Sequence, residues 1–87
     1  MELLFSPRFQ KERLSLPKHV SFELDKALKF FVSDPRHPSL RAKKLPDTNY
    51  WYARIDRAYR FTYSIEGETV TLRRVGTHDI LTRERHA

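Results

Sequence analysis

The sequence predicts a small α+β fold in the order β-α-α-β-β-β, with a helical hairpin packed on an antiparallel sheet. Between residues 21 and 33, apolar residues recur every three or four positions, as on one face of a helix. Between residues 50 and 75, apolar and polar residues alternate within three short runs separated by turn residues, which is typical of strands. With 87 residues the chain has room for a single domain, residues 1–87.

The first part of the chain is predicted to form one strand and two helices. Residues 1–5 are an apolar run that stops at Ser6, the expected N-cap of a helix over residues 7–15, because Pro7 suits the first helical position. Pro17 interrupts this pattern, and a second helix is expected from about residue 21 to residue 33. The apolar stripe that should cover the sheet consists of Phe22, Leu24, Leu28, Phe31 and Val32.

The second part of the chain is predicted to form an antiparallel meander. Residues 34–38 contain two prolines, which push the residues before them out of the helical region and end the second helix. A basic connector over residues 40–46 follows. Three strands are expected over residues 50–56, 59–65 and 69–75, joined by tight turns, with residues 79–87 as a short tail or turn.

The middle strand shows the clearest alternation. One of its faces belongs in the core and carries Tyr59, Phe61, Tyr63 and Ile65. The other face carries Arg60. Because burying an unpaired arginine costs several kcal/mol, Arg60 should face water, a ligand or a carboxylate such as that of Asp56.

Composition narrows the function. The absence of cysteine excludes a disulfide framework and a thiolate zinc site, and the four histidines lack metal-ligand spacing, so neither a metal nor a cofactor is expected. No secretion signal and no run of about 18 apolar residues is present. The sequence therefore predicts a cytoplasmic protein without a membrane partner.

Positive charge is concentrated in the middle of the chain. The formal net charge is +6, and residues 36–60 hold seven Lys or Arg residues against two Asp residues. Such a concentration favours a polyanionic partner, because each neutralised phosphate releases counterions. The alternative is a surface whose charge only keeps the protein in solution.

Three segments together resemble the RelE/ParE toxin superfamily of bacterial toxin–antitoxin pairs: HPSLRAKKL before the sheet, YWYARIDRAYRFTYSI over two strands and RRVGTHDIL at the last strand. The resemblance covers residues 21–81 and is nearest to RelE-like and YafQ-like mRNA interferases. It implies a type II toxin that cuts mRNA on the ribosome by metal-free attack of a ribose 2′-hydroxyl. It also implies a cognate antitoxin as partner, in a toxin–antitoxin hetero-oligomer.

The resemblance also implies roles for individual residues. Arg60 occupies the position of a mid-strand arginine that holds the phosphate. His78 occupies the position of a histidine that protonates the leaving 5′ oxygen, and Gly76 would kink the strand and turn His78 toward the cleft. The alternatives are an exposed strand arginine and a surface histidine that caps the strand end.

Other basic residues are assigned by the same resemblance. His37 is a candidate base or substrate contact, or alternatively a residue of a structural turn. Lys43 and Lys44 are candidates to hold the phosphate or assist deprotonation, or alternatively form a solvated loop that binds rRNA. The expected RNA contacts along the strands and connector are Arg54, Arg73 and Arg41.

One departure from the family pattern leaves other functions open. The segment ILTRERHA after the last strand lacks the aromatic residue that RelE-like toxins place there to stack on the substrate base. Trp51 is expected in the core rather than as a replacement. A ParE-like toxin that inhibits DNA gyrase and a degenerate, non-catalytic relative that binds RNA or an antitoxin therefore remain alternatives.

Overall fold

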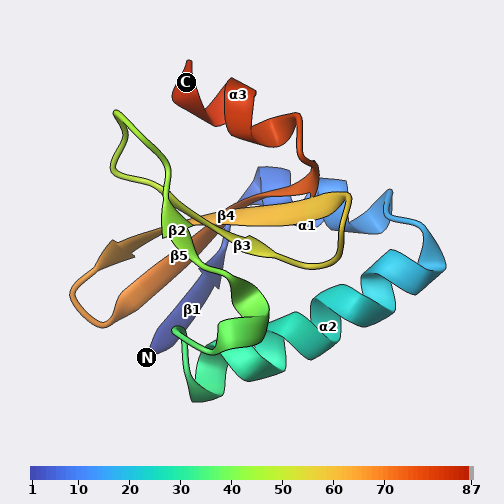
Figure 1. Cartoon of the computed structure of the whole chain (residues 1–87), viewed down its shortest axis with the longest axis horizontal. Helices are drawn as coiled ribbons and strands as arrows, with labels where there is room; N and C mark the ends of the chain where they lie inside the picture. The colour runs from blue at the N-terminus through green and yellow to red at the C-terminus, as the bar shows by residue number, and fades with distance from the viewer. Residues whose placement is uncertain (87) are drawn as a thin grey trace.

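A computed structural model describes residues 1–86 of the protein. Five strands form one sheet in the order β1-β5-β4-β3-β2 (Figure 1). The elements are β1 (Glu2–Phe5), α1 (Pro7–Leu14), α2 (Lys18–Ser33), the 3-10 helix η1 (Pro38–Leu40), β2 (Lys43–Lys44), β3 (Trp51–Arg54), β4 (Tyr59–Glu66), β5 (Thr69–Thr77) and α3 (Ile80–Arg85). The α+β fold, the helical hairpin and the three-stranded meander are thereby confirmed.

The sheet is mixed rather than wholly antiparallel. Strands β2, β3, β4 and β5 pair antiparallel, whereas β1 runs parallel to β5. A parallel neighbour requires a long crossover, and the two helices with the rest of the meander provide it. The expected antiparallel sheet is therefore wrong at its first strand.

The two helices of the hairpin begin at different kinds of cap. Ser6 caps α1 as expected, because its Oγ accepts a hydrogen bond from the Phe9 N–H at 3.0 Å. The same Oγ donates to the Arg73 carbonyl at 2.7 Å and so ties the helix to β5. Helix α2 begins at Lys18 instead of residue 21, because Pro17 takes the N-cap position and its carbonyl accepts from the Ser21 N–H at 2.9 Å.

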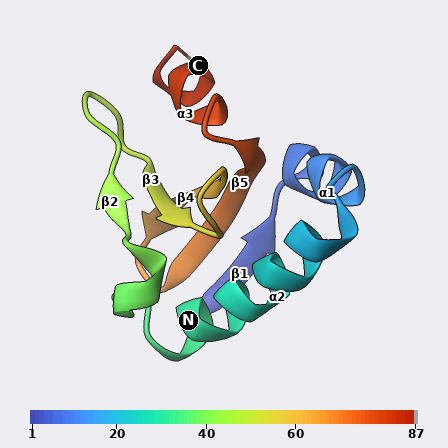
Figure 2. The same cartoon turned by 45° about the vertical axis from the view of Figure 1, so that its right-hand side comes forward.

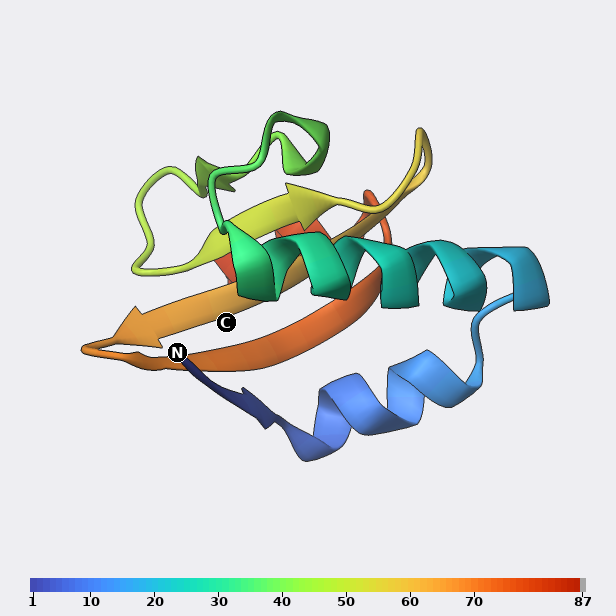
Figure 3. The same ribbon diagram turned by 90° about the horizontal axis from the view of Figure 1, so that it is seen from below.

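Helix α2 covers one face of the sheet, as Figure 3 shows from below. Its buried residues are Val20, Leu24, Ala27, Leu28 and Phe31. Phe22 is 70% exposed and Val32 is 52% exposed, so their expected burial is wrong. Phe22 lies two positions before Leu24 and therefore roughly 200° around the helix from it, on the solvent side.

The core between α2 and the sheet is built around aromatic rings. Phe31 contacts Tyr63 and Phe61 edge-on, with ring centroids 4.7 Å and 5.7 Å away. Trp51 packs against the edge of this core, as expected. Among the other residues expected there, Tyr59 is half-buried and Ile65 is 47% exposed, because Ile65 lies near the β4–β5 turn.

Part of the opposite face of the sheet is also covered, which the sequence did not predict. Residues 80–85 form helix α3, so the expected tail or turn is wrong for this segment (Figure 2). Ile80 and Leu81 are buried against Leu45, with Tyr52 packed beside them. Thr62, on this face of β4, is fully buried as a result.

The basic connector is also more ordered than expected. Its residues Lys43 and Lys44 form the edge strand β2, which pairs with β3 through Tyr52 and Trp51. The Leu45 N–H then donates to the Tyr50 carbonyl at 2.9 Å. This pairing brings the buried Leu45 into contact with α3.

Candidate active site

Three arginines of the candidate site lie close enough to influence one another. Arg54 of β3 and Arg60 of β4 are directly opposite in the antiparallel ladder, so their side chains start from the same face. Burial, followed by the positive charge of Arg54, lowers the pKa of Arg60, and Arg41 contributes in the same direction. Like charges placed directly opposite each other destabilise a sheet, and an anion bound between the two guanidinium groups would relieve this repulsion.

The turn between β3 and β4 fixes the Arg60 side chain. Its Nη1 donates to the Asp56 carbonyl at 2.5 Å and to the Tyr59 carbonyl at 2.9 Å. The Asp56 carboxylate instead accepts from the N–H groups of Ala58 and Tyr59, at 2.9 Å and 2.8 Å. Since a guanidinium has five donor hydrogens, the Nε and Nη2 edge of Arg60 remains available for a bidentate contact with a phosphate.

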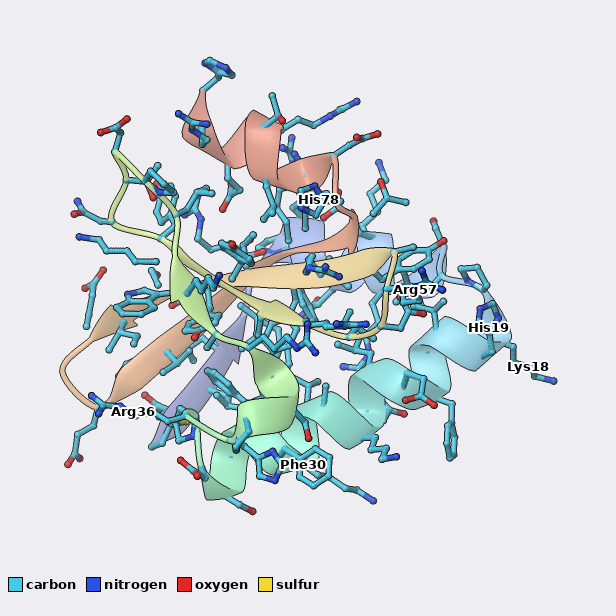
Figure 4. All side chains as sticks on the ribbon, in the orientation of Figure 1. Lys18, His19, Phe30, Arg36, Arg57 and His78 are labelled. Atoms are coloured by element: carbon cyan, nitrogen blue, oxygen red, sulfur yellow. The ribbon has the colours of Figure 1, made fainter. Side chains whose placement is uncertain are left out.

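His78 lies at the same end of the sheet as Arg60. Its N–H donates to the Ala58 carbonyl at 3.0 Å, just past the end of β5. Gly76, two residues earlier, is the direct ladder partner of Arg60. Figure 4 shows the exposed His78 side chain at the start of α3. The backbones of His78 and Arg60, two residues selected from the sequence, therefore lie at the same end of the sheet.

Gly76 allows close packing and does not kink the strand. Among glycines, only Gly67 has a positive φ, and β5 continues through Gly76 to Thr77, so the expected kink is wrong. A Cβ at residue 76 would lie 2.9 Å from Cγ2 of Ile80. The missing side chain therefore lets α3 approach the sheet directly after His78.

Arg73 makes contacts within the fold rather than with the other arginines. It is the extra residue of a β-bulge, because Thr62 pairs with Arg74 and Tyr63 pairs with Leu72. Its Nε donates to Oε2 of Glu84 at 2.7 Å, and its guanidinium lies 3.6 Å from the centre of the Tyr50 ring. Glu84 and Tyr50 were not predicted from the sequence. Neither is signalled locally, since one lies 11 and the other 23 residues from Arg73.

The two lysines of β2 differ in their surroundings, although both are exposed. Lys43 is opposite Tyr52, which lies on the same face of β3 as Arg54, so Lys43 borders the arginines. Lys44 is opposite Trp51 and lines a separate hollow with Tyr50 and Arg73. The register therefore places Lys43, but not Lys44, on the face of Arg60.

His37 lies in a different part of the molecule from His78. Its ring stacks on Phe30, with centroids 4.4 Å apart, and its Nδ1 accepts from the Ser39 N–H at 3.1 Å. Figure 4 shows Phe30 near the end of α2 and His78 across the molecule beside α3. The structure does not bring the two histidines together, and the contacts of His37 are those of a turn residue that caps η1.

The described part of the chain was also searched for a metal site and for a membrane-spanning helix. Within residues 1–86, no three histidine, aspartate or glutamate side chains gather as a metal site would need. No helix of these residues has the length and apolar character needed to cross a membrane.

The fold of this chain resembles that of several toxins of known structure. YafQ from Escherichia coli superimposes with a TM-score of 0.76 at 16% identity, over 92% of this chain and 96% of YafQ. A YoeB/ParE toxin from Agrobacterium tumefaciens gives a TM-score of 0.75 at 15% identity, over 90% of this chain and 99% of the toxin.

A chain of the archaeal RelE–RelB complex from Pyrococcus horikoshii superimposes with a TM-score of 0.71 at 18% identity, over 87% of this chain and 92% of the matched chain. No model of a known protein family matches the sequence, and no curated protein matches it. At these identities the likeness concerns the fold.

Proposed function

We propose that the protein is the toxin of a type II toxin–antitoxin pair and cuts mRNA on the ribosome. The observation that carries the proposal is the backbone pairing that brings His78 to the end of the sheet where Arg60 is held by its turn. A group able to transfer a proton thus lies beside a concentration of positive charge. Structural likeness to the toxins YafQ and RelE supports the same class of protein.

The proposed reaction is an intramolecular transesterification of the RNA. The ribose 2′-hydroxyl gives its proton to solvent water and attacks the adjacent phosphorus, the bond from phosphorus to the 5′ oxygen breaks, and a 2′,3′-cyclic phosphate forms. His78 gives its proton to the leaving 5′ oxygen. Arg60, with Arg54 and Arg41 nearby, stabilises the negative charge that develops on the phosphoryl oxygens. Lys43 adds positive charge at the border of this surface, and His37 is assigned to the turn.

We also propose that a cognate antitoxin binds this protein. YafQ has been solved with DinJ as a toxin–antitoxin complex, and RelE with RelB. The uncompensated charge of Arg41, Arg54 and Arg60 suits an acidic antitoxin segment, which would cover His78 and exclude RNA. Ribosome-bound mRNA and the antitoxin would then compete for one surface.

The test is cleavage of ribosome-bound mRNA, mapped by primer extension. His78→Gln should lower the cleavage rate by roughly 10²-fold or more, since loss of a general acid typically costs about 10²–10⁴-fold. His86→Gln is the matched control, because His86 is an exposed histidine at the end of α3. If a folded His78→Gln protein cuts mRNA as fast as the wild type, the catalytic assignment is wrong.

The same preparations distinguish the alternative functions. Inhibition of DNA supercoiling with mRNA left intact would indicate a ParE-like gyrase inhibitor. RNA or antitoxin binding with neither cleavage nor gyrase inhibition would indicate a non-catalytic relative. Growth arrest on expression, relieved by the antitoxin and by His78→Gln, is the outcome expected of the proposed toxin.

A further inference from the structure

A second basic surface lies between α1, the end of β5 and α3. Figure 2 shows the end of β5 between these two helices. A groove of about 450 Å³ occupies this position, and we call it the α1–α3 groove. Its cationic lining residues are Arg8, Lys11, Arg74 and Arg83. None of these four residues belongs to the proposed active site.

The charge of the groove is poorly compensated. Its one acidic lining residue is Glu12, whose Oε2 lies 2.6 Å from Nη2 of Arg74 and whose Oε1 accepts from the Val75 N–H at 3.2 Å. Arg8, Lys11 and Arg83 are exposed, and within residues 1–86 none of them forms an ion pair. A concave surface with this excess of cations concentrates anions.

The groove borders the proposed active site along the backbone. Its lining includes Tyr59 and Thr77, which pair with each other, and Gly76, which pairs with Arg60. His78 is the next residue after Thr77. An RNA strand whose cleaved phosphate lies at Arg60 and His78 would continue into the groove past the end of β5.

We propose that the α1–α3 groove binds backbone phosphates of the same RNA strand that the active site cuts. The inference rests on the proposed function for the identity of the strand. Arginine and lysine side chains around a concave surface suit phosphate oxygens. The half-buried Tyr59 offers a ring at the border between the groove and the active site. The groove thus adds affinity and fixes the direction in which the RNA runs, without taking part in bond cleavage.

The first test is binding of a fluorescent 12-nucleotide RNA whose riboses are all 2′-O-methylated and therefore cannot attack. Arg8→Ala with Lys11→Ala should weaken binding about 25-fold in 0.1 M salt, since each phosphate contact on single strands contributes a salt slope of about 0.7. The slope of log K against log salt should become shallower by about 1.4. Lys18→Ala with Lys29→Ala is the control, because both residues are exposed on α2 and the change in net charge is the same.

A second variant should act in the opposite direction. Glu12→Gln removes the carboxylate from the groove but keeps an oxygen that can accept from the Val75 N–H. It should release Arg74 to the RNA, tighten binding several-fold and steepen the salt slope. Because misfolding does not increase affinity, this gain separates a local electrostatic effect from damage to the fold.

Three outcomes would overturn the inference: equal losses in the α1 and α2 double variants, unchanged or weaker binding by Glu12→Gln, or a loss confined to binding of an acidic antitoxin peptide. The proposed function fails separately. If the protein cuts no mRNA but Arg8→Ala with Lys11→Ala still reduces RNA binding selectively, the groove stands and the nuclease assignment falls.

Discussion

Arg73 Nε donates to Oε2 of Glu84 at 2.7 Å, and this ion pair joins the bulge of β5 to helix α3. The carboxylate is 3% exposed and the arginine 29% exposed, with Tyr50 beneath the guanidinium. The hydrogen bond to Glu84 is the main reason that the pKa of Arg73 is raised. Because α3 begins two residues after His78, the pair helps to fix the helix that follows the proposed general acid.

Removing Arg73 should lower the free energy of unfolding more than removing Glu84. Arg73→Ala should lower the free energy of unfolding by about 3 kcal/mol, because it leaves the buried Glu84 carboxylate without its partner. Glu84→Ala should cost less, about 1–2 kcal/mol, since the partly exposed Arg73 can turn to water. Urea denaturation measures both changes.

Arg85→Ala provides the control for this comparison. Arg85 is on the same helix, but its Nη2 lies 3.9 Å from Oδ2 of Asp47 and both side chains are exposed. Its loss should cost less than about 0.5 kcal/mol. A larger loss from Glu84→Ala than from Arg73→Ala would contradict the assignment of Glu84 as the buried partner.

Gly76→Ala should move α3 and with it the site. The added Cβ would lie 2.9 Å from Cγ2 of Ile80, so the helix must shift, at a cost of about 1–3 kcal/mol. Cleavage of mRNA should fall as well, because His78 lies between residue 76 and α3. Ile80→Ala removes the obstructing methyl group, so Gly76→Ala should cost less in that background. Additive losses in the double-mutant cycle would rule out this contact as the cause.

Local sequence signals predicted much of the fold. Ser6 and Pro7 identify the start of α1 by themselves, and the alternation around Phe61 and Tyr63 identifies β4. These features depend on residues only a few positions apart. Arg60 and His78 were selected through the resemblance to the toxin superfamily, and their backbones lie at the same end of the sheet.

Features that depend on distant residues were not predictable in this way. Helix α3 has only six residues, too few to be stable from its own propensity, and Ile80 and Leu81 are buried only because Leu45 lies opposite them. The α1–α3 groove likewise combines Arg8 with Arg83 from the two ends of the chain. Periodicity within a short window carries no information about such pairs.

Arg60→Lys should lower cleavage about 10²-fold while changing the free energy of unfolding by less than about 1 kcal/mol. Arg60 uses one nitrogen for the Asp56 and Tyr59 carbonyls and keeps a two-nitrogen edge for phosphate. A lysine ammonium that holds both carbonyls retains a single donor hydrogen. Single-turnover cleavage and thermal unfolding measure the two effects. Arg57→Lys, on the exposed part of the same turn, should change neither; equal effects at both positions would argue against a phosphate contact by Arg60.

Tyr63 should make the protein less stable in strong alkali. Burial raises the pKa of its phenol to about 12, compared with about 10 in the unfolded chain. Because the folded state favours the neutral form, this contribution to stability is complete below about pH 10 and is lost as the pH rises toward 12. The difference amounts to about 3 kcal/mol.

Tyr63→Phe keeps the ring that contacts Phe31 and removes the hydroxyl that ionises. Its free energy of unfolding should therefore increase relative to that of the wild type between pH 10 and 12. Tyr59→Phe, on the same strand but half-exposed, serves as the control in urea denaturation at each pH. Parallel pH profiles for the wild type and Tyr63→Phe would show that the buried phenol does not limit alkaline stability.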